Sequence, residues 1–314
     1  MKLPVISIDP ILEAIDAHLE AEQLKERPRR YLGGSAIGDD CERKLFYNFR
    51  WVSPTVIAAT GLRAIADGHA TEALMIKRLK LVKDVELWVE EDGGQIGFTD
   101  MGGHFQGNFD GVIRHPSIGT AIWECKATNV KKFDKLKKLK SDDMDTALSK
   151  WDATYYGQAQ TYMHYSGIHL HYLTGSTPGG REALSVITKY DAQYAEQLIE
   201  RAKRVIFGNQ PASRMSGDPG WFACKWCSHW DVCHASALPQ VSCRTCAHST
   251  AKPDGTWYCE KHYTPLSDDD QRVGCTHHRY HPRLLSGVPV AQNDDGTITY
   301  QMNNGSTYTD GDKP

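Results

Sequence analysis

The first two hundred residues alternate between helical and strand-like spacing of hydrophobic positions. Residues 10–26 repeat apolar side chains every three or four positions, as an amphipathic helix does. Asp9 suits the N-cap of this helix and Pro10 suits its first position. Two further helices are predicted over residues 41–51 and about 62–81.

Short strand-like runs follow, each bounded by Gly, Asp or Pro turn signals. They occupy residues 85–90, 95–99, 104–114 and 120–127. The strongly charged stretch 130–150 is expected to form a helix plus a loop. The remaining pattern predicts, in order, a helix over 153–166, strands over 170–175 and 182–190, and a helix over 191–207. This order of elements indicates one α/β domain with a mixed central sheet flanked by helices.

The character of the sequence changes near residue 240. From there its segments are short and rich in turn residues, Cys and His. Residues 288–310 place Asp-Gly and Asn-Gly turns between alternating segments, which indicates a small β-meander or a loose tail. We therefore expect three parts, covering residues 1–239, 240–282 and 283–314.

The composition indicates the cellular compartment of the protein more clearly than its function. The 314 residues carry 36 basic and 39 acidic side chains, so any surface for nucleic acid must be a local patch. No apolar run approaches the roughly twenty residues needed to span a bilayer, and the N-terminus is unlike a signal peptide. We expect a soluble, cytoplasmic protein. In a reducing cytoplasm its nine cysteines are better explained as thiols or metal ligands than as disulfides, which remain the alternative.

Eight of the nine cysteines fall into two sets of four. The first cysteine set is Cys41, Cys224, Cys227 and Cys233. Its C-x2-C-x5-C cluster has its fourth member almost two hundred residues upstream, so a shared metal centre would tie the two ends of a domain together. By spacing alone, four thiolates suit zinc and an iron–sulfur cluster equally well.

The second cysteine set is Cys243, Cys246, Cys259 and Cys275. Its spacing resembles a zinc ribbon, with Asp254-Gly255 as a hairpin turn before Cys259. His262 competes for the fourth ligand position. Further candidates are His277, His278 and His281. A structural role is the default for this zinc module, and a DNA clamp or a protein contact are the alternatives.

A carboxylate pair and a lysine form the candidate catalytic centre. Glu124 and Lys126 alternate along one strand and therefore share a face, and a neighbouring strand would place Asp110 beside Glu124. Paired carboxylates suit Mg²⁺ or Mn²⁺, and a lysine near a metal-bound water suits hydrolysis of a phosphodiester. The alternative is an ordinary surface ion pair, but the apolar neighbours Trp123 and Val112 favour a buried site.

Five short motifs in a fixed order resemble the PD-(D/E)XK nucleases of the RecB-like iron–sulfur branch. This branch includes CRISPR-adaptation nucleases and the nuclease domains of AddB-type helicase–nucleases. The matching residues are Gly68 to Glu72, Gly107 to Gly111, Glu124-Cys125-Lys126, Gln158 to Tyr162, and the first cysteine set. The resemblance covers roughly residues 33–235 and implies a restriction-endonuclease-like core.

The resemblance also implies roles for individual residues. The metal ligands that it implies are Asp110, Glu124, the backbone carbonyl of Cys125, His69 and Glu72. Lys126 would be the catalytic lysine, with Gln158 and Tyr162 facing the site from a helix. The alternatives are a surface histidine without metal for His69 and ordinary packing for Tyr162. The first cysteine set would hold a [4Fe–4S] cluster, which fastens the fold without taking part in the chemistry.

A basic stretch immediately follows Lys126. The residues predicted to contact the DNA backbone are Lys131, Lys132, Lys135 and Lys138. A solvated charged helix is the alternative.

Together these patterns predict a Mg²⁺- or Mn²⁺-dependent DNA exonuclease that acts on single strands or DNA ends in repair, recombination or mobile-element processing. The chain has no phosphate-binding loop of the G-x-x-x-x-G-K-[ST] type, so it would depend on frayed ends or a helicase partner. The alternatives are a duplex-end exonuclease or endonuclease of the same fold, and a non-catalytic nucleic-acid-binding scaffold with structural metal sites.

Overall fold

A five-stranded mixed sheet organises the part of the chain that carries the candidate site. The computed structural model describes residues 9–311. The strands of this sheet are β2 (Glu86–Trp88), β7 (Gly111–His115), β8 (Gly119–Ala127), β9 (Leu170–Ser176) and β10 (Ala183–Lys189). Their order is β10-β9-β8-β7-β2, with β8 parallel to β9 and the other neighbours antiparallel. The predicted mixed α/β architecture is confirmed at this level.

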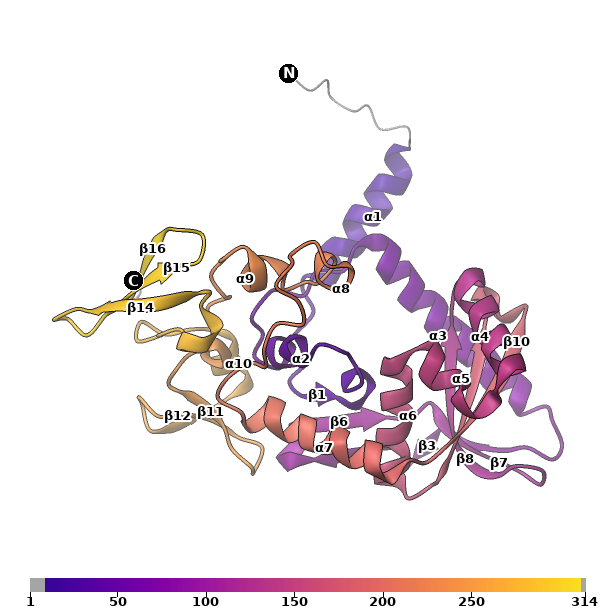
Figure 1. Ribbon diagram of the computed structural model, residues 1–314. Helices are drawn as coiled ribbons and strands as arrows, with labels where there is room; N and C mark the ends of the chain where they lie inside the picture. Colours follow the sequence, from indigo (N-terminus) through magenta and orange to yellow (C-terminus); the bar gives the residue numbers. More distant parts are fainter. Residues whose placement is uncertain (1–8, 312–314) are drawn as a thin grey trace.

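Helices cover both faces of the sheet (Figure 1). They are α3 (Ala59–Leu79) on one face and α4 (Val130–Asp142), α5 (Met144–Trp151) and α6 (Ala153–Ser166) on the other. Side chains of β8 alternate between these layers. Trp123 and Cys125 pack with Met75 of α3, whereas Ile122 packs with Leu173 and Met163 beneath α6.

Residues 130–150 differ from the expected helix plus loop, because they form two helices. Asp143 separates α4 from α5, and its carboxylate accepts a hydrogen bond from the Asp145 N–H as the cap of α5. Phe133, Leu136 and Leu148 are buried beneath these helices. The apolar residues within the charged stretch therefore give each helix a buried face.

The predicted strand over residues 104–114 is also divided. Its first half is β6 (Phe105–Asn108), which lies in a three-stranded sheet between β1 (Leu32–Gly33) and β5 (Gly97–Asp100). Its second half is β7 of the main sheet. At Gly107 a Cβ atom would lie 2.6 Å from the Phe98 and Tyr162 rings, and at Gly111 it would lie 2.6 Å from the Trp88 carbonyl. The chain crosses between sheets where only glycine fits, and Asp110 lies at the crossing.

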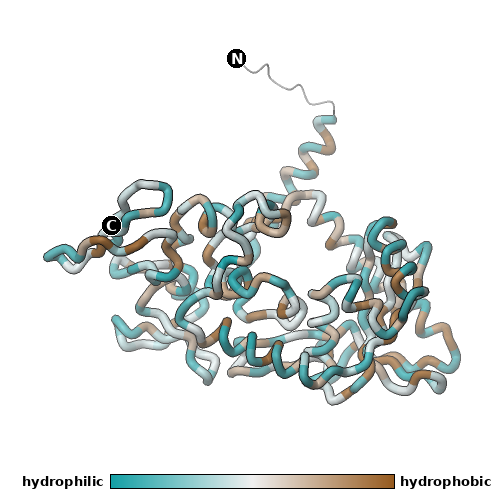
Figure 2. The backbone as a smooth tube through the Cα atoms, in the orientation of Figure 1, coloured by the Kyte–Doolittle hydropathy of each residue, from teal (hydrophilic) through white to brown (hydrophobic). Residues whose placement is uncertain are grey.

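A second apolar core joins the small sheet to the helices α2 (Glu42–Phe49) and α7 (Ala192–Phe207). Two short helices, α8 (Phe222–Lys225) and α9 (Trp230–His234), return to the start of α2. The helix α1 (Pro10–Gln23) projects from the body and mixes hydrophobic with hydrophilic positions (Figures 1 and 2). Within residues 9–311, no helix combines the length and the apolar character needed to cross a membrane.

Two small antiparallel sheets and a short helix follow residue 240. They are formed by β11 (Ser249–Ala251), β12 (Trp257–Cys259) and β13 (Thr264–Leu266), then α10 (Asp268–Arg272), and then β14 (Gly287–Gln292), β15 (Ile298–Met302) and β16 (Thr307–Asp310). The strands β14, β15 and β16 pair in sequence order as an antiparallel meander. A two-stranded hairpin of β3 (Glu90–Glu91) and β4 (Gly94–Gln95) completes the strands of the described residues.

Arg244 fastens the module of residues 240–282 to the core. Its buried guanidinium donates hydrogen bonds to the backbone carbonyls of Phe49 and Arg30, at 2.8 and 2.9 Å, and lies 4.0 Å from the Trp51 ring centroid. The β11–β12 hairpin also packs against the core so closely that a Cβ atom on Gly255 would lie 1.9 Å from the Gly102 carbonyl oxygen. The module and the core therefore share one tightly packed interface.

Candidate active site

Strand β8 brings Glu124 and Lys126 together on the face covered by α6. Glu124 is buried at 2% exposure, and its Oε1 atom lies 2.5 Å from the Lys126 Nζ. Gln158 of α6 donates a second hydrogen bond to the same oxygen, at 2.7 Å. The other oxygen, Oε2, is buried and has no hydrogen-bond partner. A buried carboxylate oxygen without a partner is costly unless a cation or a proton satisfies it.

Asp110 lies opposite this pair because Gly111 of β7 is paired with Trp123 of β8. Its Oδ2 accepts a hydrogen bond from the Cys125 backbone N–H, at 2.8 Å. Burial raises the pKa of Asp110, and the positive charge of Lys126 partly opposes this shift. The Cys125 thiol points to the opposite face, and burial raises its pKa to about 12.

Helix α3 supplies two further predicted residues. His69 is exposed and Glu72, almost one turn later, is half-buried. Electrostatic interactions connect both side chains with Asp110. The structure therefore gathers the predicted side chains His69, Glu72, Asp110, Glu124 and Lys126 around one end of β8.

The charges in this cluster depend on burial. Burial raises the pKa of Glu124 to about 7, although Lys126 lowers it in part. For Lys126, burial alone would lower the pKa, but the carboxylates of Glu124 and Asp110 outweigh this effect and raise it above the usual value. Lys126 is therefore a half-buried cation at neutral pH.

The oxygen donors in the cluster fit a hard divalent cation. Asp110 and Glu124 face each other from neighbouring strands, and the unpartnered Oε2 of Glu124 offers one ligand position. Mg²⁺ and Mn²⁺ favour such carboxylate oxygens. Asp110, Glu124, His69 and Glu72 would hold the ion, and the Cys125 carbonyl remains a predicted ligand.

Helix α6 places three aromatic or amide side chains over the site. Gln158 contacts Glu124 directly, whereas the buried Tyr162 ring lies 4.7 Å from the Phe109 ring and its hydroxyl interacts with Gln158. Tyr155 was missed by the sequence analysis. Its ring centroid lies 5.1 Å from the Lys126 Nζ. Its spacing of i, i+3 and i+7 with Gln158 and Tyr162 was the signal that could have found it.

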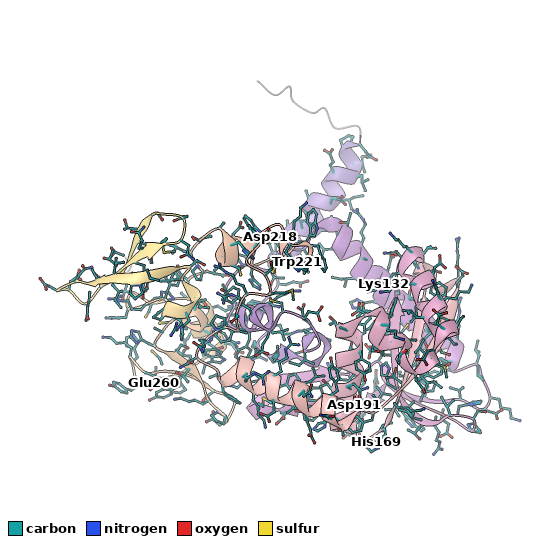
Figure 3. All side chains as sticks on the ribbon, viewed as in Figure 1. Lys132, His169, Asp191, Asp218, Trp221 and Glu260 are labelled. Carbon is teal, nitrogen blue, oxygen red and sulfur yellow. The ribbon has the colours of Figure 1, made fainter. Side chains whose placement is uncertain are left out.

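The four predicted DNA-binding lysines of α4 divide into two pairs. Lys132 forms an ion pair with Asp152 at 2.7 Å and lies 4.7 Å from the Tyr155 ring centroid (Figure 3). Lys135 donates to the Trp151 carbonyl at 3.2 Å. The other two, Lys131 and Lys138, are exposed. Two lysines are thus engaged by the protein, and two are available to a ligand.

The first cysteine set lines one cavity of about 230 Å³. Cys41 caps α2, whereas Cys224, Cys227 and Cys233 come from α8, α9 and the turn between them. The two segments are held together by His229, whose Nε2 lies 2.8 Å from the Asn48 Oδ1. All four thiols of the set are free and line one cavity, although no three of their sulfurs lie mutually within 4.8 Å.

The second cysteine set lines a hollow of about 520 Å³ together with His262 and His277. Among the residues that the structure describes, one group of potential ligand atoms lies mutually within 4.8 Å, and it consists of His262, Cys275 and His277. The other two candidates are outside this group, although His278 lines the same hollow and His281 does not. His278 is buried with its Nε2 3.3 Å from the Thr245 Oγ1, and the His281 Nδ1 accepts from the Arg283 N–H at 3.3 Å.

A buried histidine in β9 makes stability depend on pH. Both ring nitrogens of His171 are buried without partners, and burial, aided by the charge of Lys126, lowers its pKa to about 3. Below about pH 6.5, the ordinary pKa of histidine, His171 binds a proton in the unfolded chain but stays neutral in the folded protein. The free energy of unfolding should therefore fall by about 2 kcal/mol between pH 6.5 and 5 through this group. Urea denaturation at both pH values checks this.

The matched variants are His171→Leu and His169→Leu. His169 is exposed and lies two residues earlier in the same segment (Figure 3). The loss of stability on acidification should become smaller in His171→Leu and stay unchanged in His169→Leu. An identical pH dependence in both variants would contradict the assignment to His171.

Comparisons with known proteins leave the family open. No family model matches the sequence, and no curated protein matches it. Among solved structures, SSO0001 is 16% identical with a TM-score of 0.42, over 73% of this chain and 98% of that one. An alkaline exonuclease from Laribacter hongkongensis is 14% identical with a TM-score of 0.39, over 60% and 90%. A phage related exonuclease from Haemophilus somnus 129PT is 15% identical with a TM-score of 0.33, over 45% and 68%. These scores are too low to assign a fold family or a function.

Proposed function

We propose that the protein is a metal-dependent DNA nuclease of the PD-(D/E)XK type. One observation carries the proposal: the buried Glu124 carboxylate has one oxygen without a partner, beside Asp110 and the cation Lys126. Burying a cluster of two carboxylates and a lysine is costly, and phosphodiester hydrolysis gives each member a use.

The residues divide the chemistry among them. Asp110 and Glu124 bind Mg²⁺ or Mn²⁺, and His69 and Glu72 complete the site. When bound, such an ion would supply Lewis-acid chemistry and a site for activating water. Lys126 orients the attacking water and stabilises negative charge on the phosphoryl oxygens. Gln158 positions Glu124 through its hydrogen bond, and Tyr162 supports Gln158.

The proposed substrate is single-stranded DNA or a DNA end. The exposed Lys131 and Lys138 would bind phosphates, whereas Lys132 and Tyr155 border the site next to Lys126. An exonuclease of this kind serves repair, recombination or mobile-element processing in the cytoplasm, with a helicase partner where the substrate is duplex.

Both cysteine sets have proposed structural roles. The first set would bind a [4Fe–4S] cluster that holds α2 against α8 and α9. The second set would bind zinc and stabilise the module of residues 240–282, which has little core of its own. Neither centre lines the Glu124 site.

Digestion of labelled DNA tests this function. Linear single-stranded, linear duplex and circular single-stranded DNA are each labelled and incubated with Mg²⁺ or Mn²⁺. We expect short products from linear single strands, little from blunt duplex and none from circles. Cleavage of circles would show an endonuclease, and efficient digestion of blunt duplex would show a duplex-end exonuclease. Binding without cleavage under all conditions would favour the non-catalytic scaffold.

A further inference from the structure

The second cysteine set lies beside more donor atoms than one zinc ion can use. A structural zinc ion takes four ligands in a tetrahedron. The four thiols and the imidazoles of His262 and His277 all line the same hollow. Cys275 belongs to both groups, because its sulfur interacts with Cys243 and Cys246 and also lies 3.8 Å from the His262 Nε2.

We propose a second zinc position, formed by His262, Cys275 and His277, next to the four-cysteine position. The ligand atoms of these three residues lie mutually within 4.8 Å. The His262 and His277 rings pack edge to face with centroids 5.2 Å apart, so the two imidazoles already converge. The thiolate of Cys275 would be shared by the two positions, since a thiolate sulfur has lone pairs for both.

The two positions lie at different depths. Cys246 and Cys259 are buried, whereas His262, Cys275 and His277 are all exposed. The four-cysteine position is therefore enclosed on the side of Cys246 and Cys259, while the new position has three exposed protein ligands and a fourth position open to solvent. That fourth position is accessible to water.

Charge favours the second ion. One zinc ion with four thiolates carries two negative charges, and the carboxylates of Asp269 and Asp270 line the same hollow, with Lys261 as a cation among them. A second zinc ion bound through two neutral imidazoles would bring the centre to neutrality. The added cation thus relieves repulsion that a single zinc ion would leave.

This centre is remote from the proposed nuclease site. Glu260, the residue after Cys259, and Lys132 lie at opposite ends of the molecule in Figure 3. The second zinc ion therefore does not take part in phosphodiester cleavage. The proposal stands whether or not the protein is a nuclease.

Zinc counting in the full-length protein tests the proposal. We expect the double variant His262→Ala/His277→Ala to bind one zinc equivalent fewer per chain than the wild type, as measured by mass spectrometry of the metal. The matched control is His248→Ala, because His248 is half-buried beside the same hollow but outside the three-ligand group. It should keep the wild-type count.

Thiol protection separates two positions from one. In the double variant, the thiols of Cys243, Cys246 and Cys259 should remain resistant to iodoacetamide, because the four-cysteine position still holds its ion. Equal zinc contents in the double variant and the wild type would overturn the proposal. Alkylation of these three thiols in the double variant would also overturn it, because the histidines would then belong to a single site.

Discussion

Replacing Lys126 by alanine should lower the rate of metal-dependent DNA cleavage by about a thousandfold or more, because the variant loses the cation beside the carboxylate pair. The fold should survive the change. Glu124 already has a pKa of about 7, so it can take up a proton once its partner is gone. Cleavage of end-labelled single-stranded DNA gives the rate, and circular dichroism with thermal melting gives the fold.

Two companion variants sharpen this result. Glu124→Gln keeps the size of the side chain and the hydrogen bond from Gln158 but removes the charge, so metal binding and cleavage should both fail. Lys203→Ala removes an exposed lysine that pairs with Glu200 on α7, and it should cleave at the wild-type rate. Wild-type cleavage by Lys126→Ala would exclude the proposed chemistry.

Replacing Cys41 by serine should remove the iron–sulfur cluster and much of the protein's stability. The cluster would close a loop of about 190 residues between Cys41 and Cys233. In the chain-entropy model a cross-link over such a loop contributes about 5 kcal/mol, because it restricts the unfolded chain. Anaerobic purification should therefore give a brown wild-type protein absorbing near ~400 nm and a colourless, less stable variant.

The control for this experiment is Cys125→Ala, which removes a buried thiol on the α3 side of the main sheet. It should keep the colour together with the iron and sulfide content. A colourless wild-type protein with one zinc ion on the first cysteine set would show that the site is a zinc centre. Unchanged stability of Cys41→Ser would show that this set does not hold the fold together.

The sequence predicted the structure best at positions where a single physical rule determines it. Alternation along a strand put Glu124 and Lys126 on one face, and the structure shows them in contact. Helical spacing likewise predicted α6, which carries Gln158 to Glu124. The mixed sheet followed from the order of helices and strands. The roles of these residues in catalysis remain predictions.

The sequence was least informative where tertiary contacts determine the local structure. The break at Asp110 depends on the Phe98 and Tyr162 rings packing against Gly107, and sequence spacing does not contain that contact. The group of His262, Cys275 and His277 likewise depends on how the segment after α10 lies against the turn between β12 and β13. The local spacing of hydrophobic residues contains no information about either of these tertiary contacts.

The interface around Arg244 restricts where the chain can be shortened. The guanidinium hydrogen-bonds to the carbonyls of Phe49 and Arg30 and stacks on Trp51, so the interface includes the start of the core. A fragment ending near residue 239 would leave those carbonyls without the Arg244 guanidinium as their hydrogen-bond donor. It would also expose an aromatic surface to solvent. Such a fragment should aggregate on expression. A minimal soluble version should instead retain the second cysteine set.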